Sequence, residues 1–200
     1  MNSEELKNRF ITTTKKYIQR EGIDDLLAWL ETTDFYISPA STRFHGTYEG
    51  GLVEHSLMVF NELLFLAEAY NGVNVNVNPR WTSDVHYTLE TLAIVSLLHD
   101  LCKIQNYAIE MRNVKENDKW IQKPYYTHKE VLPFGGHGSK SMFLVMKYMK
   151  LTEEEAIAIV NHMGAWDNST YGNPSNSYET YPLAWLLHVA DESATYIRHI

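Results

Sequence analysis

Apolar residues recur at three- and four-residue steps along most of this 200-residue chain. That spacing keeps them on one face of a helix, so it predicts helices in place of sheets. Near the start of the chain, Asn2 and Glu5 have the spacing of a capping box, which predicts that a helix begins there. On this basis helices are expected at about residues 3–18, 23–31, 51–70, 83–102, 138–150, 153–162 and 181–198.

One segment follows a different period. Between Tyr107 and Arg112 large apolar residues occupy every second position, which is typical of a strand. Residues 120–127 return across a turn at Glu116-Asn117-Asp118-Lys119, so a small hairpin is expected between helices. Stretches rich in Gly, Pro, Asn, Ser or Thr predict loops over residues 32–50, 71–79 and 164–179. The expected fold is all-α, a helical bundle with a small inserted β-hairpin, as one domain over residues 1–200.

The composition excludes several classes of protein. With 44% hydrophobic and 21% charged residues, the chain is neither a disordered tail nor a coiled coil. Its net charge of −8 argues against a duplex-DNA binder but leaves room for a small phosphorylated substrate. The single cysteine, Cys102, suits a reducing compartment. The charged start and the absence of a long apolar run predict a cytoplasmic protein with no signal peptide and no membrane span.

Ionisable residues interrupt the apolar helices at several points. A lone His on an apolar face is more often a hydrogen-bonded core residue than a metal ligand, and a buried Asp costs several kcal/mol unless it is paired. Four His and two Asp on four or five inward-facing segments are much harder to explain as separate core residues. These six residues are His55, His99, Asp100, His137, His162 and Asp191.

The segments around these residues resemble one known family. The segments are 44–57, 97–104, 136–138, 161–164 and 186–191. In this order they are similar to the HD superfamily of metal-dependent phosphohydrolases, and most of all to the subgroup that includes an HD-type 3′→5′ exoribonuclease. The resemblance covers about residues 43–195 and implies an HD-type helical domain, with the helices of residues 3–31 packed on it. Two positions depart from the family: Met163 stands where many binuclear relatives have a second His, and Cys102 stands where Gly is usual.

The resemblance also implies roles for individual residues. One ion would be bound by His55, His99, Asp100 and Asp191, and a second by His137 and His162 with Asp100 as the bridge. Such mixed ligands suit Mn, Fe, Co or Zn, and Mg is also allowed. Lys103 would meet a phosphate oxygen or the leaving group, although a plain salt bridge explains a lysine there too. Candidate contacts to the substrate are Arg43 and His45, although a solvated surface loop explains these two almost equally well. Lys140, three residues after His137, is a weaker candidate of the same type.

The function expected from this resemblance is hydrolysis of a nucleotide or a short oligonucleotide by a metal-activated hydroxide. Two alternatives stay open at this point. Some HD-fold proteins are di-iron oxygenases with much the same ligands, and an HD module can also bind a nucleotide without catalysis. The sequence does not decide among a phosphomonoesterase, a phosphodiesterase and a nucleotidase. HD proteins are often dimers or larger, so the resemblance also allows a homo-oligomer.

Overall fold

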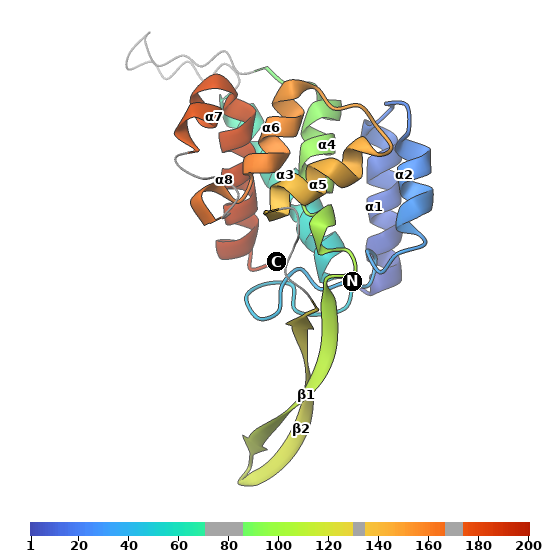
Figure 1. Cartoon of the computed structure of the whole chain (residues 1–200), viewed down its shortest axis with the longest axis vertical. Helices are drawn as coiled ribbons and strands as arrows, with labels where there is room; N and C mark the ends of the chain where they lie inside the picture. The colour runs from blue at the N-terminus through green and yellow to red at the C-terminus, as the bar shows by residue number, and fades with distance from the viewer. Residues whose placement is uncertain (71–85, 130–134, 167–173) are drawn as a thin grey trace.

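A computed structural model describes residues 1–70, 86–129, 135–166 and 174–200. The described chain is mostly helical, and one two-stranded antiparallel hairpin projects from the helical body (Figure 1). The elements are α1 (Ser3–Tyr17), α2 (Ile23–Leu30), α3 (Gly51–Tyr70), α4 (Leu89–Leu98), the 3₁₀ turn η2 (Leu101–Lys103), β1 (Tyr107–Glu116), β2 (Lys119–His128), α5 (His137–Met146), α6 (Glu153–Asn161), the 3₁₀ turn η3 (Gly164–Trp166), α7 (Ser175–Thr180) and α8 (Pro182–Tyr196).

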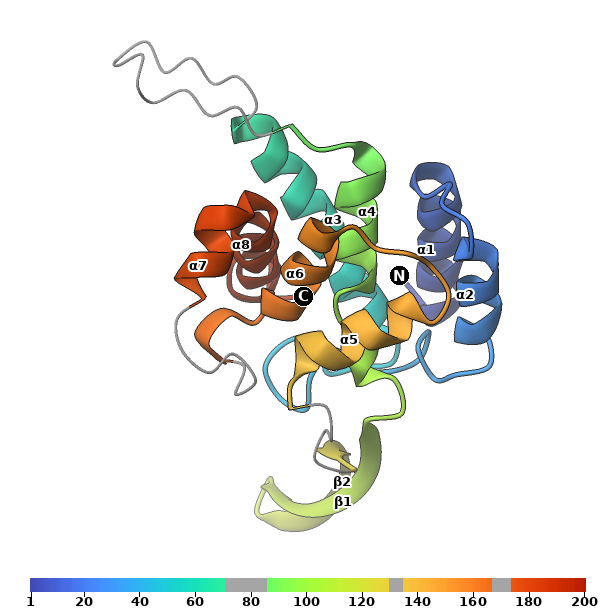
Figure 2. The same ribbon diagram turned by 45° about the horizontal axis from the view of Figure 1, so that its top comes forward.

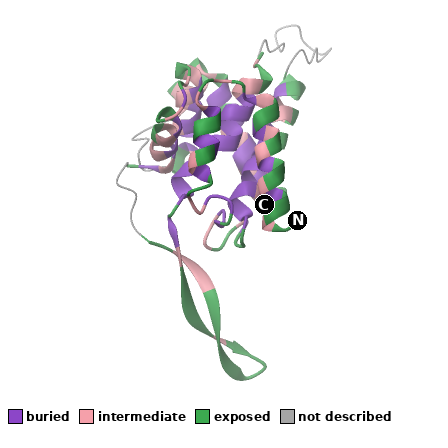
Figure 3. Cartoon of the chain, turned by 90° about the vertical axis from the view of Figure 1, so that its right-hand side faces the viewer, coloured by how far each residue is buried: buried purple, intermediate pink, exposed green. Residues whose placement is uncertain are grey.

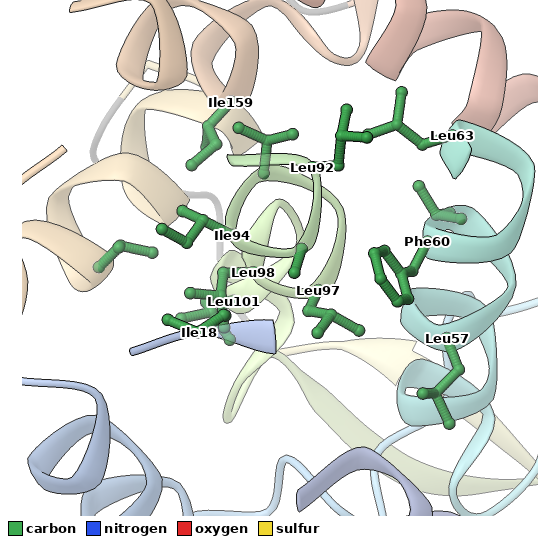
Figure 4. Packing of buried hydrophobic residues seen from close by; sticks show 14 of the residues in the cluster. Ile18, Leu57, Phe60, Leu63, Leu92, Ile94, Leu97, Leu98, Leu101 and Ile159 are labelled. Atoms are coloured by element: carbon green, nitrogen blue, oxygen red, sulfur yellow. The ribbon is translucent and has the colours of Figure 1, made fainter. Parts of the chain in front are cut away.

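Helix α4 lies at the centre of the core. Its sequence is apolar on every side, and a helix of that kind must be covered on every side. Residues Leu92 to Leu98 are buried accordingly, and α4 contacts α1, α3 and α6. Figure 4 shows Leu92, Ile94 and Leu97 of α4 among the core side chains around them. Because α4 is central, the His99-Asp100 pair that follows its last residue lies in the interior.

The first two helices belong to the same core. The capping box predicted at Asn2 and Glu5 is confirmed, and α1 begins directly after Asn2. Leu6 and Phe10 of α1 and Leu26 of α2 are buried in one cluster with residues of α3, α4 and α8. The two helices lie side by side along one flank of the bundle (Figure 2). No helix in the described ranges combines the length and the apolarity that a membrane crossing requires.

A buried ion pair ties the segment after α1 to the start of α6. Arg20 donates from Nη1 to Glu155 Oε2 at 2.5 Å and from Nη2 to Glu155 Oε1 at 3.0 Å. Glu155 is fully buried and also completes the capping box with Thr152. Burial would raise the pKa of Glu155, but the hydrogen bonds from Arg20 hold it below its ordinary value. This bidentate pair fixes α6, which ends at the residue before His162.

Replacing Glu155 by glutamine is expected to lower the free energy of unfolding by about 3 kcal/mol, because Arg20 keeps its charge and loses its anion. Chemical denaturation measures this loss. Glu153→Gln, an exposed change in the same turn of α6, is the control and should cost less than about 1 kcal/mol. Since the folded-state pKa of Glu155 is depressed, the difference between parent and variant should shrink as the pH falls through that pKa. A Glu155→Gln variant as stable as its control would contradict this account.

The predicted hairpin is confirmed. Strands β1 and β2 pair from Tyr107 opposite His128 to Glu116 opposite Lys119. The two turn residues, Asn117 and Asp118, both have positive φ, at 48° and 61°. Asn and Asp tolerate this left-handed conformation, which the turn of a two-residue hairpin requires. Most of the hairpin is exposed and extends away from the buried body (Figure 3).

Three predicted boundaries are wrong. The helix predicted to reach residue 102 ends at Leu98, since His99 closes it and the chain tightens into η2. The helix predicted to reach residue 150 ends at Met146, where a turn brings the chain close to Gly22. The loop predicted over residues 164–179 contains η3 and α7, and α7 is held by packing on α8. The loop predicted over residues 71–79, the start of a helix near residue 83 and part of the loop at 164–179 lie outside the described residues.

Candidate metal centre

Five of the predicted ligand residues meet inside the helical bundle. His55 comes from α3, His99 and Asp100 follow α4, His162 follows α6, and Asp191 is on α8. The three His side chains are completely buried, and the two Asp residues are 2% and 7% exposed. The sequence places these residues up to 136 positions apart, and the packing of α3, α4, α6 and α8 brings them together.

Local backbone structure fixes how the three imidazole rings point. The last four carbonyls of a helix lack partners within it. His99 Nδ1 donates to Ser96 O of α4, and His162 Nδ1 donates to Ile159 O of α6, both at 2.7 Å. His55 Nδ1 lies 2.9 Å from the main-chain oxygen of Ile200. Because a main-chain oxygen only accepts, each Nδ1 bears a hydrogen, and the neutral form of each ring presents the lone pair of Nε2.

Those three Nε2 atoms face carboxylate oxygens without a hydrogen bond. All three are buried and have no hydrogen-bond partner among the described residues. His55 Nε2 lies 3.0 Å from Asp191 Oδ1, and His99 Nε2 lies 3.4 Å from Asp100 Oδ2. His162 Nε2 lies 3.6 Å from Asp100 Oδ1. A nitrogen lone pair and a carboxylate oxygen at this distance repel each other unless a cation lies between them.

The charges of the cluster do not balance. Asp100 is paired with Lys103, whose Nζ lies 2.6 Å from Asp100 Oδ2. Burial would raise the pKa of Asp100, but the Lys103 ammonium holds it well below its ordinary value. In the described part of the chain, no Lys or Arg comes within 4.0 Å of Asp191, and Arg198 pairs with Glu62 instead. With neutral imidazoles, two carboxylates and one ammonium leave a net negative charge in the interior, which a bound cation would compensate.

The spacing of the ligand atoms fits a metal ion. Two ligand atoms that each lie about 2.1 Å from a tetrahedral ion are about 3.4 Å apart. The distances from His55, His99 and His162 to the nearest carboxylate oxygens lie between 3.0 and 3.6 Å. Two overlapping sets of three buried residues can hold an ion, and His99 belongs to both. The sets are His55, His99 and Asp191, and His99, Asp100 and His162.

The sixth predicted ligand, His137, approaches from the start of α5. A Cβ on the next residue, Gly138, would lie 2.2 Å from Val160 O of α6, so only glycine allows α5 to pack this closely. A ring nitrogen of His137 then lies within 4.8 Å of a carboxylate oxygen of Asp100. His137 and His162 thus each have a ligand atom near Asp100, in two separate groups of three residues, and their sharing of one ion stays a prediction.

The two predicted lysines have different surroundings. Lys103 is 8% exposed, and its ammonium contacts Asp100 at the ligand cluster. Burial would lower the pKa of Lys103, but Asp100 raises it above its ordinary value. Lys140, predicted as a substrate contact, donates from Nζ to Cys102 O at 2.7 Å. Its ammonium thereby supports η2 from the side of α5.

The predicted loop residues lie at two depths. The His45 ring packs on the ring of His55, with centroids 4.8 Å apart, and neither of its nitrogens has a hydrogen-bond partner among the residues that the structure describes. Burial, with the neighbouring His55, lowers the pKa of His45 to about 4. Arg43 is exposed, and its guanidinium lies 5.9 Å from the ring centre of Phe44. The same loop therefore reaches both the ligand cluster and the surface.

Arg43 also lines a cavity of about 770 Å³ between this loop and the hairpin. The hairpin contributes Arg112, Tyr125 and Tyr126 among others. Among the described residues, the lining includes no Asp or Glu and none of the six predicted ligands. The sequence analysis missed these hairpin residues, because only the curve of β1 and β2 toward residues 42–48 brings them beside Arg43.

Two further residues next to the ligands were not assigned a role from the sequence. Cys102 Sγ lies 3.3 Å from His137 Nδ1, and its position in place of the family's usual Gly was the available signal. His188 Nδ1 donates to His162 O at 2.7 Å, and its ring stacks on Tyr178. His188 thus supports the turn that carries His162. It lies three residues before Asp191 on α8, so both side chains are on the same face of that helix.

Comparison with protein-family models, curated proteins and solved structures gave no match to this chain. The support for a metal centre is therefore the geometry of the buried His and Asp side chains. The resemblance to the HD superfamily rests on the sequence segments 44–57, 97–104, 136–138, 161–164 and 186–191 alone.

Proposed function

We propose that this protein is a metal-dependent phosphohydrolase of the HD type that acts on a nucleotide or a short oligonucleotide. The observation that supports this most is the set of three buried Nε2 lone pairs, from His55, His99 and His162, directed at two carboxylates. Histidine nitrogen together with carboxylate oxygen favours Mn, Fe, Co or Zn over Ca or Mg.

The chain has ligands for two ions that share Asp100. His55, His99, Asp100 and Asp191 would hold one, and Asp100, His137 and His162 would hold the other. When bound, a pair of divalent ions polarises a phosphoryl oxygen and supplies a hydroxide at neutral pH. The protein itself orients the imidazoles through the Ser96, Ile159 and Ile200 oxygens.

Lys103 provides positive charge beside the same carboxylate. An ammonium has three N–H donors, and the contact with Asp100 uses one of them. The remaining donors are available to a phosphoryl oxygen or to the leaving-group oxygen, which gains negative charge as its bond to phosphorus breaks. His45, with two buried and unpartnered ring nitrogens beside His55, is the second polar group that a substrate would meet.

The cavity beside the hairpin supports an anionic, aromatic substrate. Arg43 and Arg112 provide two guanidinium groups, and Tyr125 and Tyr126 provide aromatic rings. No Asp or Glu is among the described lining residues, although Glu110 accepts hydrogen bonds from Tyr125 and Thr127 of the lining. Guanidinium groups bind phosphates and aromatic rings stack on bases. Because the metal ligands do not line this cavity, it would hold a part of the substrate away from the scissile bond.

The experiment that tests this function is a substrate panel with metal-depleted protein. The protein is reloaded separately with Mn, Fe, Co, Zn or Mg and incubated with nucleoside mono-, di- and triphosphates and short oligonucleotides. Hydrolysis is expected with at least one transition metal, and a chelator should abolish it reversibly. Protein that binds metal but hydrolyses no member of the panel, or whose turnover consumes oxygen, would contradict the proposal.

A further inference from the structure

The single cysteine of the chain lies within the second group of ligands. Cys102 is completely buried in η2, two residues after Asp100. Its sulfur lies 3.3 Å from His137 Nδ1 and 3.7 Å from Asp100 Oδ1. One ligand atom from each of Asp100, Cys102 and His137 lies within 4.8 Å of the other two, so these residues can share one ion. Thiol, imidazole and carboxylate groups therefore meet at one point in the interior.

A second observation points to a ligand at the same place. His162 Nε2 is fully buried, has no hydrogen-bond partner in the described part of the chain, and lies 3.6 Å from Asp100 Oδ1. This is the same oxygen that Cys102 Sγ approaches. The unused lone pair of His162 and the sulfur are thus both directed at one carboxylate oxygen, although they come from α6 and η2.

The separations match those around a metal bound by sulfur. A zinc-type ion lies about 2.3 Å from a thiolate and about 2.1 Å from nitrogen or oxygen, so tetrahedral ligands of the two kinds are about 3.6 Å apart. The two sulfur distances, 3.3 and 3.7 Å, lie on either side of that value. The sulfur thus lies at a ligand-like distance from both His137 and Asp100, whereas His162 meets Asp100 in a separate group with His99.

The backbone of Cys102 is held on both sides. Its N–H donates to Ser141 Oγ at 3.0 Å, and its carbonyl accepts from Lys140 Nζ at 2.7 Å. Both partners are on α5, the helix that begins with His137. One helix therefore sets the position of the sulfur and of the imidazole together, which is the preorganisation that a metal site requires.

We propose that Cys102 is a metal ligand, and that the second ion is held by Asp100, Cys102, His137 and His162. This inference rests on the metal centre of the proposed function and adds its ligand chemistry. On binding, the thiol proton leaves to solvent and a metal–sulfur bond forms. A thiolate is a soft ligand, so this position selects Zn, Fe or Co and disfavours Mg and Mn, whereas the first position, with nitrogen and oxygen ligands alone, does not discriminate in this way.

The test is the absorption spectrum of the cobalt-loaded protein. Thiolate bound to Co²⁺ gives a sulfur-to-metal charge-transfer band in the near ultraviolet, which nitrogen and oxygen ligands do not give. Metal-free, reduced protein is titrated with Co²⁺ without oxygen. The band is expected to appear with the second equivalent bound, and because Cys102 is the only cysteine, no other residue can produce it.

Variants at position 102 and a control complete the test. Cys102→Ser and Cys102→Ala should lack the band, keep one cobalt ion per chain, and bind the second at least about 10-fold more weakly. Ser141→Ala, which removes the contact to the Cys102 N–H and leaves the sulfur, should keep the band. The parent spectrum decides the question even if a variant fails to fold.

Two results would overturn the inference, and they are distinguishable. If the parent binds cobalt but shows no sulfur band, the metal centre stands, and Cys102 is only a hydrogen-bond partner that orients His137. If the parent binds no cobalt at all, both the thiolate ligand and the proposed function are wrong.

Discussion

Asp100→Asn is expected to reduce metal affinity more than about 100-fold and to lower hydrolysis to that of metal-free protein. Asp100 lies between the two groups of ligands, with Oδ2 near His55 and His99 and Oδ1 near His162. Substitution of residues that only support a ligand already costs 10- to about 100-fold in metal affinity. A shared ligand should cost more, because both ions lose a negative oxygen. Metal content after dialysis and initial rates on the preferred nucleotide measure the two effects.

Two variants make this result interpretable. Asp100→Asn leaves the buried Lys103 ammonium without its anion, which should lower the free energy of unfolding by about 3 kcal/mol or more. The double variant Asp100→Asn/Lys103→Met removes both charges and should recover much of that stability without recovering metal. Asp25→Asn, an exposed change on α2, should alter neither the free energy of unfolding nor the metal affinity. An Asp100→Asn protein that folds and binds both ions like the parent would show that Asp100 is not a ligand.

Lys103→Met is expected to lower kcat by about 10²–10³ with a smaller change in KM, because it removes one preorganised donor to the developing phosphoryl charge. Metal binding should be retained or strengthened, since Lys103 Nζ occupies Asp100 Oδ2 in the metal-free protein and competes with a cation there. Steady-state kinetics and metal titration measure these effects separately.

The stability of the Lys103→Met protein provides a second readout. Without metal, the variant leaves the Asp100 carboxylate buried among neutral rings, so it should unfold at a lower temperature than the parent. With metal, the ion replaces the lost ammonium, and the gain in Tm on metal addition should exceed that of the parent. A variant that loses its metal yet keeps a normal kcat per bound ion would show Lys103 to be a salt-bridge partner only.

The helices that local patterns define were predictable from the sequence. The side chains of Asn2 and Glu5 contact only neighbouring backbone, so their capping box could be recognised without the rest of the fold. The hairpin turn at Asn117 and Asp118 is local in the same sense. The end of α4 is different. Leu101 and Ile104 keep a helical apolar spacing beyond Leu98, yet the helix stops where His99 bonds to Ser96 O and the chain tightens into η2.

The candidate site was predictable as a set of residues and not as an arrangement. His55 and Asp191 could be proposed because each interrupts an apolar helix face, where an ionisable side chain needs a partner. Which atoms meet depends on helix packing. The approach of Cys102 to His137, 35 residues later, depends on the contact of α5 with η2. Likewise, no local pattern links Arg43 to Arg112, which line one cavity only because the hairpin curves toward residues 42–48.

Diffraction from zinc-loaded crystals at the absorption edge of zinc tests the central claim most directly, because it locates the ion independently of the protein atoms. This account predicts an anomalous peak about 2.0–2.2 Å from His55 Nε2, His99 Nε2 and carboxylate oxygens of Asp100 and Asp191. A second peak is predicted on the other side of Asp100, near His137 and His162. Loaded crystals with no anomalous peak among these atoms would contradict the claim that the buried His and Asp cluster is a metal centre.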